Sequence, residues 1–598
     1  MFTGTFTRGE ALYIFSKNGF KKSMIHIPLA VIAFAATVCL AIGEVLLFYH
    51  KSGENKICLS CHEGIEEVSE NHKFPCAECH TDSIEYAHSG NDLDAVCGKC
   101  HAYWLNAVSG SVMFTNSGII KGIGLVWEEA GEDMPVKLYE KYCSVCHISS
   151  QFTIGGGAHR SSGCATCHTT YNRSGSYDGS DKRIKGKRPY PETHSLLKLP
   201  TDERCAVCHN RGGRIAFTYS GLYDGNNSLV PTQNGGAGPI MASDRRNVRN
   251  MVPDIHSAGD IECIDCHTQV EVMGDGQRYE DMFQQTEIGC ESCHGDGESL
   301  PKSGAVDSYT TELRLNYAKS PPADSVPLTT RKGRVLPNVF KQNGRYWLLT
   351  KRNGGLKEIK TIKDTPEHKV AGHERLDCIS CHSKVIAQCY SCHIRYDERD
   401  YSVSYLTGEI SPGAFSETED IRLFHPFPLA VNRFGKITPV TPGRQSLFTH
   451  IDAEGKVIKE ERLLKYRGEN RNNPKFAPFF GHNLGGKAIG CSECHGNPYF
   501  YGFGDGLFST KDGGEFVSPL IDDTSGKPLA ALYSISGGRL DPTCSVVGGE
   551  ASMFTREEII RIIDVNRCIV CHDNPKYFTE KRDYEKILSD SIHLSLIR

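Results

Sequence analysis

The sequence lacks a large excess of charge of either sign. Its 598 residues carry 67 lysines and arginines against 72 aspartates and glutamates, a net charge of −5. No basic patch marks a surface for nucleic acid, so a nucleic-acid partner is excluded. The chain also lacks a low-complexity tail and any repeat of fixed period beyond one short motif, so neither a disordered tail nor a repeat array is expected.

Cysteine, in contrast, is abundant, and its spacing is regular. Twelve times the chain reads Cys-x-x-Cys-His, which uses 24 of the 26 cysteines. Numbered 1 to 12 in chain order, the motifs are Cys58-Cys61-His62, Cys76-Cys79-His80, Cys97-Cys100-His101, Cys143-Cys146-His147, Cys164-Cys167-His168, Cys205-Cys208-His209, Cys263-Cys266-His267, Cys290-Cys293-His294, Cys378-Cys381-His382, Cys389-Cys392-His393, Cys491-Cys494-His495 and Cys568-Cys571-His572.

The motif has a specific chemical use. Two thiols three positions apart reach the two vinyl groups of one porphyrin, and the histidine that follows binds its iron. Disulfides would not require a histidine after every second cysteine, and zinc sites gather four ligands from paired motifs. A thioredoxin-like motif would occur once, beside a βαβ pattern. The motifs therefore predict twelve covalently bound haem c groups.

On these motifs, from Cys58 to His572, the chain resembles the multihaem (dodecahaem) c-type cytochromes of anaerobic respiration and extracellular electron transfer. The resemblance implies a haem-dominated fold of mostly loops and short α-helices around a haem chain. Small β-hairpin insertions and one N-terminal transmembrane helix complete the expected fold.

An apolar run suggests how the chain is attached. Residues 27–43 carry no charge, and after Glu44 the run continues to Tyr49. This length is enough to span a bilayer. Four basic residues precede it, which places residues 1–23 in the cytoplasm, a transmembrane anchor at 24–49 and the rest outside the cytoplasm. The alternative is a signal peptide cleaved after Ala41-Ile42-Gly43.

The density of the motifs along the chain divides residues 50–598 into regions. We expect a haem-dense domain at 50–298 with haems 1–8, a β-rich insertion at 299–377, haems 9–10 at 378–393, a second β-rich insertion at 394–490 and a C-terminal region with haems 11–12 at 491–598. Asn343-Gly344, between apolar runs, predicts a hairpin. Thr555 to Glu558 reads as a capping box that begins a helix, and a second helix is expected at 579–590.

Each haem iron also needs, or leaves open, a sixth ligand. Thirteen histidines lie outside the motifs, and His26 would be on the wrong side of the membrane. Twelve therefore remain as candidate distal ligands for twelve irons. Eight of the twelve motifs have one of these histidines four to eleven residues upstream, a placement that in multihaem cytochromes usually serves a neighbouring haem. The twelve are His50, His72, His88, His159, His194, His256, His368, His373, His425, His450, His482 and His593.

The expected function is electron transfer through bis-histidine haems on the periplasmic side of the cytoplasmic (inner) membrane. The resemblance implies as partners the membrane quinol pool or an integral-membrane quinol dehydrogenase, other c-type cytochromes, and a larger respiratory or outer-membrane conduit complex. A terminal reductase of nitrite, hydroxylamine or a sulfur oxyanion, with one open haem, is the alternative. No motif ends in Lys or has enlarged spacing, which weakens that reading. A cytochrome-filament subunit is a third possibility if the N-terminal segment is cleaved.

Overall fold

The computed structural model describes only part of the chain. The described residues are 72, 94–127, 130–148, 163–171, 185–186, 194–210, 215–224, 248–442, 446–464, 475–503, 507–509, 515–517, 533–536, 539–542, 545–546, 551–569, 571–572 and 574–579. The expected anchor, motifs 1 and 2 and the helix expected at 579–590 fall outside these residues, apart from Thr579. Within the described part, no helix is long and apolar enough to cross a membrane.

Short helices build the first half of the described chain. Ser111 begins one of them by accepting a hydrogen bond from Phe114 N, and Asn116 ends it in the left-handed conformation at φ 50°. Such side-chain caps are needed because a helix of one or two turns leaves most of its end groups unsatisfied. The helices are α3 Lys99–Ser109, α4 Val112–Thr115, α5 Ser117–Trp127, α6 Met134–Lys141, α9 Ile215–Tyr219, α11 Ile255–Ala258, α13 Gln269–Met273, α14 Met282–Gln285 and α16 Ser308–Arg314.

An antiparallel four-stranded sheet follows motif 8. It comprises β5 Val326–Thr329, β6 Val335–Gln342, β7 Arg345–Leu349 and β8 Leu356–Ile359, in that order. Both residues of the Asn343-Gly344 turn have positive φ, at 49° and 77°, as a type I′ hairpin requires. The predicted hairpin is confirmed. Its apolar face packs on Ile261, Ile288 and Cys293, so this sheet supports motifs 7 and 8.

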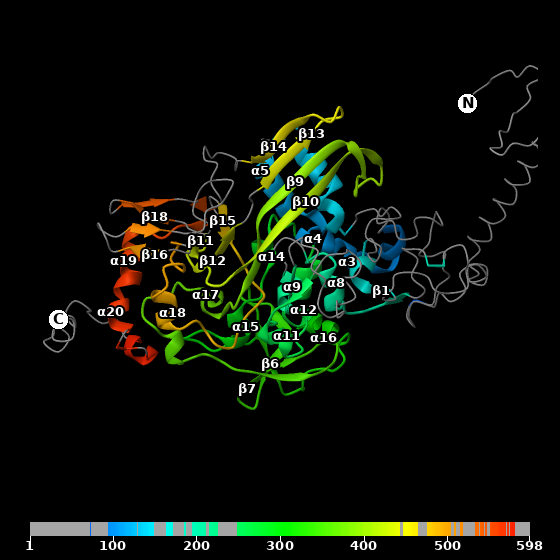
Figure 1. The fold of residues 1–598 in the computed structure, drawn as a ribbon. Helices are drawn as coiled ribbons and strands as arrows, with labels where there is room; N and C mark the ends of the chain where they lie inside the picture. Colours follow the sequence, from blue (N-terminus) through cyan, green and yellow to red (C-terminus); the bar gives the residue numbers. More distant parts are fainter. Residues whose placement is uncertain are drawn as a thin grey trace, which may run out of the picture.

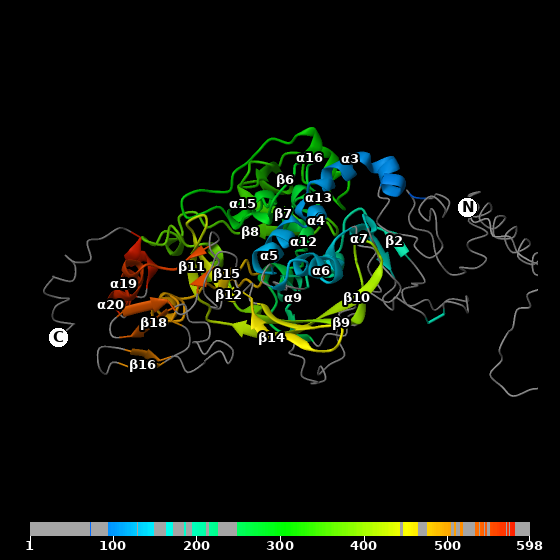
Figure 2. The ribbon, with the colours of Figure 1, turned by 90° about the horizontal axis from the view of Figure 1, so that it is seen from above.

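A second four-stranded sheet is more extended. Its order is β10 Ile410–Phe424, β9 Ile386–Val403, β13 Ser446–Ile451 and β14 Val457–Leu463. Strand β13 runs parallel to β9, and the other pairs are antiparallel. Trp127 and Leu138, from α5 and α6, pack against Tyr396 and Phe448 of this sheet. The two helices therefore cover one face of the long β9–β10 pair (Figures 1 and 2).

The C-terminal part contains a five-stranded sheet of order β20-β15-β12-β11-β21. Its strands are β11 Leu429–Asn432, β12 Ile437–Pro442, β15 Lys475–Pro478, β20 Ser545–Val546 and β21 Ala551–Ser552. Helix α19, Arg556–Asp564, packs Ile559 into the same core. It begins with the predicted capping box: Glu558 N donates to Thr555 Oγ1, and Thr555 N donates to Glu558 Oε2.

Four two-stranded pairs complete the described strands. They are β1 Thr169–Tyr171 with β2 His194–Leu196, β3 Leu222–Asp224 with β4 Val248–Asn250, β16 Leu507–Ser509 with β17 Glu515–Val517, and β18 Tyr533–Ser536 with β19 Arg539–Pro542. The expected short helices and loops are confirmed. The β structure is more substantial than small hairpin insertions, because distant segments join into four- and five-stranded sheets.

Candidate haem-binding sites

Most described motifs lie on a single helical turn. In a helix, residues three apart share a face, so both cysteines of a motif present their sulfurs to the same side. None of the cysteines whose side chains are described is in a disulfide. The motif elements are the 3₁₀ turn Cys143–Cys146, α7 Ala165–His168, α8 Asp202–Ala206, α12 Cys263–Cys266, α15 Cys290–His294, α17 Cys378–His382, α18 Cys491–His495 and α20 Asn566–Ile569, with Cys97 in the turn Asp94–Gly98 before α3.

Motif 10 is built differently, because it lies within strand β9. Cys389 pairs with Ile421 and Cys392 with Glu419, and the register shifts between them. The shift inserts one extra residue between the two cysteines of β9, which is a β-bulge. In a regular strand, positions three apart face opposite sides. The bulge interrupts this alternation between positions 389 and 392, so the backbone of motif 10 differs from that of the helical motifs.

The motif histidines are oriented by their second ring nitrogen. In four of them Nδ1 lies at hydrogen-bonding distance from a main-chain carbonyl, which leaves Nε2 free to bind a metal. The pairs are His168 with Leu197 O at 2.9 Å, His294 with Lys360 O at 2.7 Å, His382 with Gly485 O at 3.1 Å and His495 with Ile562 O at 3.0 Å.

Two motif histidines use a carboxylate instead. His267 Nδ1 lies 2.6 Å from Glu271 Oε2, and His393 Nδ1 lies 2.6 Å from Glu461 Oε2. Glu271 follows His267 by one helical turn, so a local pattern could have identified it. Glu461 lies 68 residues after His393 along the chain, so no local pattern could have identified it.

Five motif histidines face a second histidine ring at a nearly constant separation. An iron between two imidazoles forms two bonds of about 2 Å, so the ring centres would lie about 6 Å apart. The observed ring-centre distances fit this value. They are 6.1 Å for His72 and His101, 6.2 Å for His256 and His294, 6.2 Å for His267 and His482, 6.1 Å for His368 and His382, and 5.8 Å for His373 and His495.

The buried members of these pairs are suited to bind a metal. Burial lowers the pKa of His373 to about 4, and the neighbouring His495 lowers it further. Burial likewise lowers the pKa of His482 to about 4, with His267 adding to the effect. Both imidazoles are therefore neutral at pH 7 and keep the lone pair that iron requires. Donor type, spacing and protonation together fit haem c.

Other candidate distal histidines are placed differently. His450 Nε2 lies 2.9 Å from Glu398 Oε1, and its ring packs against Tyr396. His425 Nε2 lies 3.8 Å from Glu493, a residue of motif 11. His194 pairs through its backbone with Tyr171, just after motif 5, and its side chain is outside the description. His50, His88, His159 and His593 lie outside the described residues.

The remaining described motif histidines have other neighbours. The ring of His147 lies 5.9 Å from that of Phe114, and the ring of His572 lies 4.9 Å from that of Tyr577. Burial lowers the pKa of His209, and His267 adds to the effect.

Contacts between motifs put them in a spatial order. One thiol shifts the pKa of a neighbouring thiol between motifs 3 and 5 (Cys97 and Cys164), 6 and 7 (Cys205 and Cys263), and 8 and 9 (Cys290 and Cys378), because the two lie close together. Cys266 likewise raises the pKa of Cys293 between motifs 7 and 8, and Cys491 raises the pKa of Cys381 between motifs 9 and 11.

Side-chain hydrogen bonds to the main chain supply the other links. Arg204 donates to Thr166 O between motifs 6 and 5, and Asn566 donates to His495 O between motifs 12 and 11. The described order is therefore 3-5-6-7-8-9-11-12, which crosses the molecule from α8 through α12 and α15 to α18 and α20 (Figure 1). Motif 4 lies beside this row, where Cys208 Sγ is 3.8 Å from Cys146 O.

Residues 239–295, which contain motifs 7 and 8, match the family of cytochrome c554 and c-prime. The match indicates a multihaem c-type cytochrome. No curated protein and no solved structure matches the chain. The family region implies c-type haem and suggests electron transfer.

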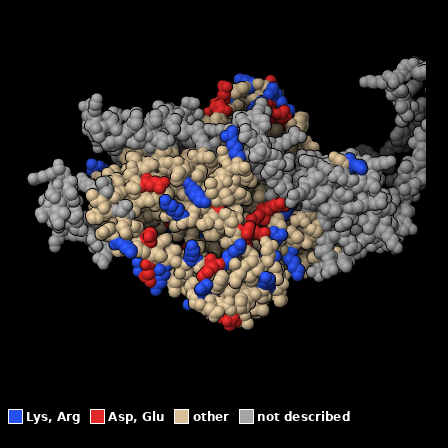
Figure 3. Space-filling view, turned by 60° about the horizontal axis from the view of Figure 1, so that its bottom comes forward, with Lys and Arg blue, Asp and Glu red and all other residues tan. Residues whose placement is uncertain are grey.

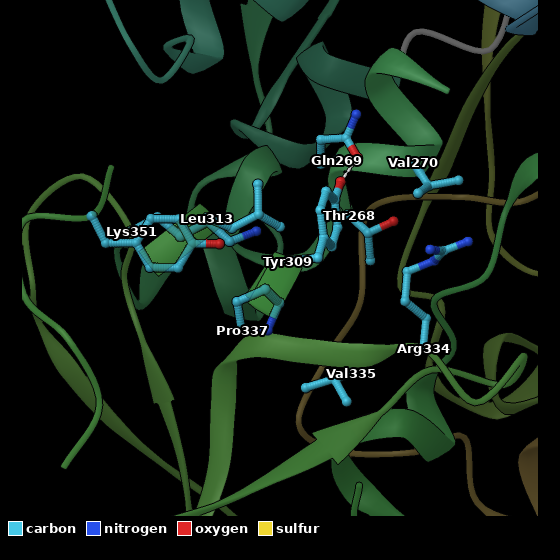
Figure 4. A pocket seen from close by; sticks show the side chains of 10 residues that line it. Thr268, Gln269, Val270, Tyr309, Leu313, Arg334, Val335, Pro337 and Lys351 are labelled. Atoms are coloured by element: carbon cyan, nitrogen blue, oxygen red, sulfur yellow. Dashed lines mark hydrogen bonds between the residues drawn. The ribbon is translucent and has the colours of Figure 1, made fainter. Parts of the chain in front are cut away.

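One cavity in the described part of the chain lies directly beside motif 7. Tyr309 donates a hydrogen bond to Gln269 on one side of it, and Arg334 and Lys351 also line it (Figure 4). Its volume of about 20 Å³ is close to that of a single water position. The cavity is too small for an oxyanion substrate. On the face drawn in Figure 3, acidic and basic side chains are interspersed, so the described part of that face has no patch of one sign.

Proposed function

We propose that this chain is a dodecahaem electron-transfer cytochrome, anchored in the cytoplasmic membrane by residues 24–49, with its haems on the periplasmic side. Electrons would come from the quinol pool or an integral-membrane quinol dehydrogenase. They would leave to other c-type cytochromes or to a larger conduit complex. The twelve motifs, the apolar run and the family match support this proposal.

The observation that carries the proposal is the set of five histidine pairs near 6 Å. A haem held between two imidazoles is six-coordinate and low-spin. It has no free position for a substrate, and its geometry changes little when the iron changes oxidation state. The axial ligands of a haem iron influence what the haem does, and two histidines favour electron transfer over catalysis.

The decisive experiment is a low-temperature EPR survey of the oxidised protein, with haem counted as the pyridine haemochrome. We expect twelve haems per chain, all low-spin. A high-spin haem whose signal changes on addition of nitrite, sulfite or cyanide would overturn the proposal. The mass of the purified protein tests the anchor, because cleavage after Gly43 would remove the first 43 residues.

A second candidate, the terminal reductase with one open haem, is favoured by one observation. Twelve histidines are available for twelve irons, yet Nε2 of His450 is hydrogen-bonded to Glu398. If His450 does not bind iron, one haem lacks a histidine. His450→Ala separates the candidates: a new high-spin haem in the variant makes His450 a ligand, whereas an unchanged spectrum with a high-spin haem already in the wild type supports the reductase.

A further inference from the structure

Two buried carboxylates contact axial histidines of neighbouring haem sites. Glu271 Oε2 lies 2.6 Å from Nδ1 of His267 in motif 7. Asp254 Oδ1 lies 3.0 Å from Nδ1 of His256, whose ring faces His294 of motif 8. Motifs 7 and 8 are adjacent in the row, so the two carboxylates act on neighbouring haems.

Both carboxylates are buried and accept hydrogen bonds from main-chain amides. Only 4% of the Glu271 side chain and 2% of the Asp254 side chain are exposed. Glu271 Oε1 accepts from Ile288 N at 2.6 Å, and Asp254 Oδ2 accepts from Leu484 N at 2.7 Å.

A carboxylate acts on an axial histidine more strongly than a carbonyl does. The carboxylate accepts a hydrogen bond from Nδ1–H. This gives the imidazole partial imidazolate character and makes Nε2 a stronger donor to iron. A stronger donor stabilises ferric over ferrous iron and lowers the reduction potential. Among the described residues, Nδ1 of the distal histidines at motifs 7 and 9 lies at hydrogen-bonding distance from a neutral oxygen, Phe480 O for His482 and Thr365 Oγ1 for His368.

One cation opposes the effect at motif 7. Lys351 Nζ lies 3.3 Å from His267 O and also donates to Ile264 O. Its charge would raise the potential, but it interacts with the buried Asp265, whose carboxylate also accepts from Lys351 N at 2.7 Å. Lys351 touches the main chain of the motif, whereas Glu271 bonds the ligand ring itself, so we expect Glu271 to dominate.

A third carboxylate provides an internal comparison. Glu461 bonds His393 of motif 10 at the same 2.6 Å, but its side chain is 52% exposed. Water and salt screen an exposed charge far more than a buried one. The same contact should therefore lower the potential of haem 10 less than that of haem 7.

We propose that Glu271 and Asp254 make haems 7 and 8 the low-potential pair of the row 3-5-6-7-8-9-11-12. The pair would separate two stretches of higher potential, so an electron crossing the protein would take its uphill step there. Glu271 and Asp254 are positioning residues, since they act through the axial histidines. This inference rests on the proposed bis-histidine ligation of these two haems.

The test is EPR-monitored potentiometry of the full-length protein and its variants. Glu271→Gln keeps the size of the side chain and removes its charge. We expect about a tenfold change in the equilibrium constant for reducing one haem, or about 59 mV upward for a one-electron couple. Asp254→Asn should raise the reduction potential of a different haem. Glu461→Gln, the matched control, should shift the reduction potential of a third haem by less than half as much.

Three outcomes are distinguishable. The inference is overturned if the lowest reduction potentials in the titration are unchanged in Glu271→Gln. It is also overturned if Glu461→Gln shifts a reduction potential as much as Glu271→Gln does. If the variants fail to incorporate twelve haems, near-infrared magnetic circular dichroism of the wild type decides. The two haems reduced last should show the band displacement of imidazolate character, and a uniform band contradicts the inference. A high-spin haem elsewhere would refute the proposed function while leaving this ranking intact.

Discussion

At the scale of single residues, local spacing predicts which side chains are candidate haem ligands but not which iron each one would bind. His256 lies seven residues before motif 7, yet its ring faces His294 of motif 8. His373 precedes motif 9 but faces His495 of motif 11. The partner depends on where a distant motif folds back, and no sequence interval encodes that. Glu461 was missed for the same reason.

The pair of His373 and His495 gives a prediction at this scale. His373→Ala should convert one haem from low-spin to high-spin and let one equivalent of carbon monoxide bind, because haem 11 loses its sixth ligand. EPR and optical spectra of the oxidised and reduced protein measure both changes. His26→Ala, a histidine expected on the cytoplasmic side, is the control and should leave every haem low-spin. Twelve low-spin haems in His373→Ala would show that the pair does not hold an iron.

At the scale of elements, prediction succeeds where the signal is local. The Asn343-Gly344 hairpin and the capping box of α19 depend on residues within four positions of one another. Strand β9 shows where prediction from the sequence fails. Its parallel pairing with β13 joins His393 to Leu447, and such a contact depends on the whole intervening chain. The same strand carries motif 10, which sequence alone placed outside the β insertion.

Helix α19 gives a stability prediction, because Ile562 O accepts from His495 Nδ1 near the helix end. Thr555→Ala removes the N-cap and should cost about 1 kcal/mol of local stability. Amide hydrogen exchange of Ile559 should then accelerate about fivefold. Glu557→Ala, in the same first turn, leaves the capping box intact and should change exchange by less than half as much. Equal effects would mean that the cap contributes nothing specific.

The same helix should respond to acid. Burial raises the pKa of Glu558, but hydrogen bonds from Thr555 N and Arg375 outweigh it and lower the pKa below its ordinary value of 4.5. A lowered pKa stabilises the fold fully above 4.5, and this contribution is lost as the pH falls through the folded-state value. The protection of the α19 amides against exchange, relative to the intrinsic rate at each pH, should therefore fall as the pH drops below 4.5. Arg375→Gln should weaken the pH dependence, and an unchanged profile would argue against the ion pair.

At the scale of the whole molecule, the sheets pack against the haem motifs and support them. The sheet β5-β6-β7-β8 packs on motifs 7 and 8, and the five-stranded sheet shares its core with Cys494 of motif 11. The motif positions can be read from the sequence, because each motif is local. The order 3-5-6-7-8-9-11-12 could not be predicted, since its links join segments that are far apart along the chain, as between Cys381 and Cys491.

That order gives a prediction for the complete protein. Removing haem 8 with Cys290→Ser and Cys293→Ser should interrupt the row, because motif 8 links motif 7 to motif 9. In membranes supplied with quinol, the haems of motifs 9, 11 and 12 should stay oxidised over the time in which the wild type is fully reduced. Stopped-flow absorbance of the haem α-band measures the reduced fraction.

The matched control removes haem 12 with Cys568→Ser and Cys571→Ser. Motif 12 ends the described row at its contact with motif 11, so the haems of motifs 3 to 11 in the row should be reduced as fast as in the wild type. Haemochrome counts of eleven would show that each variant lost only its intended haem. If both variants slow reduction equally, electrons do not follow the row. If neither does, a path that bypasses motif 8 connects the two halves, and the protein is a branched network of haems instead of a single wire.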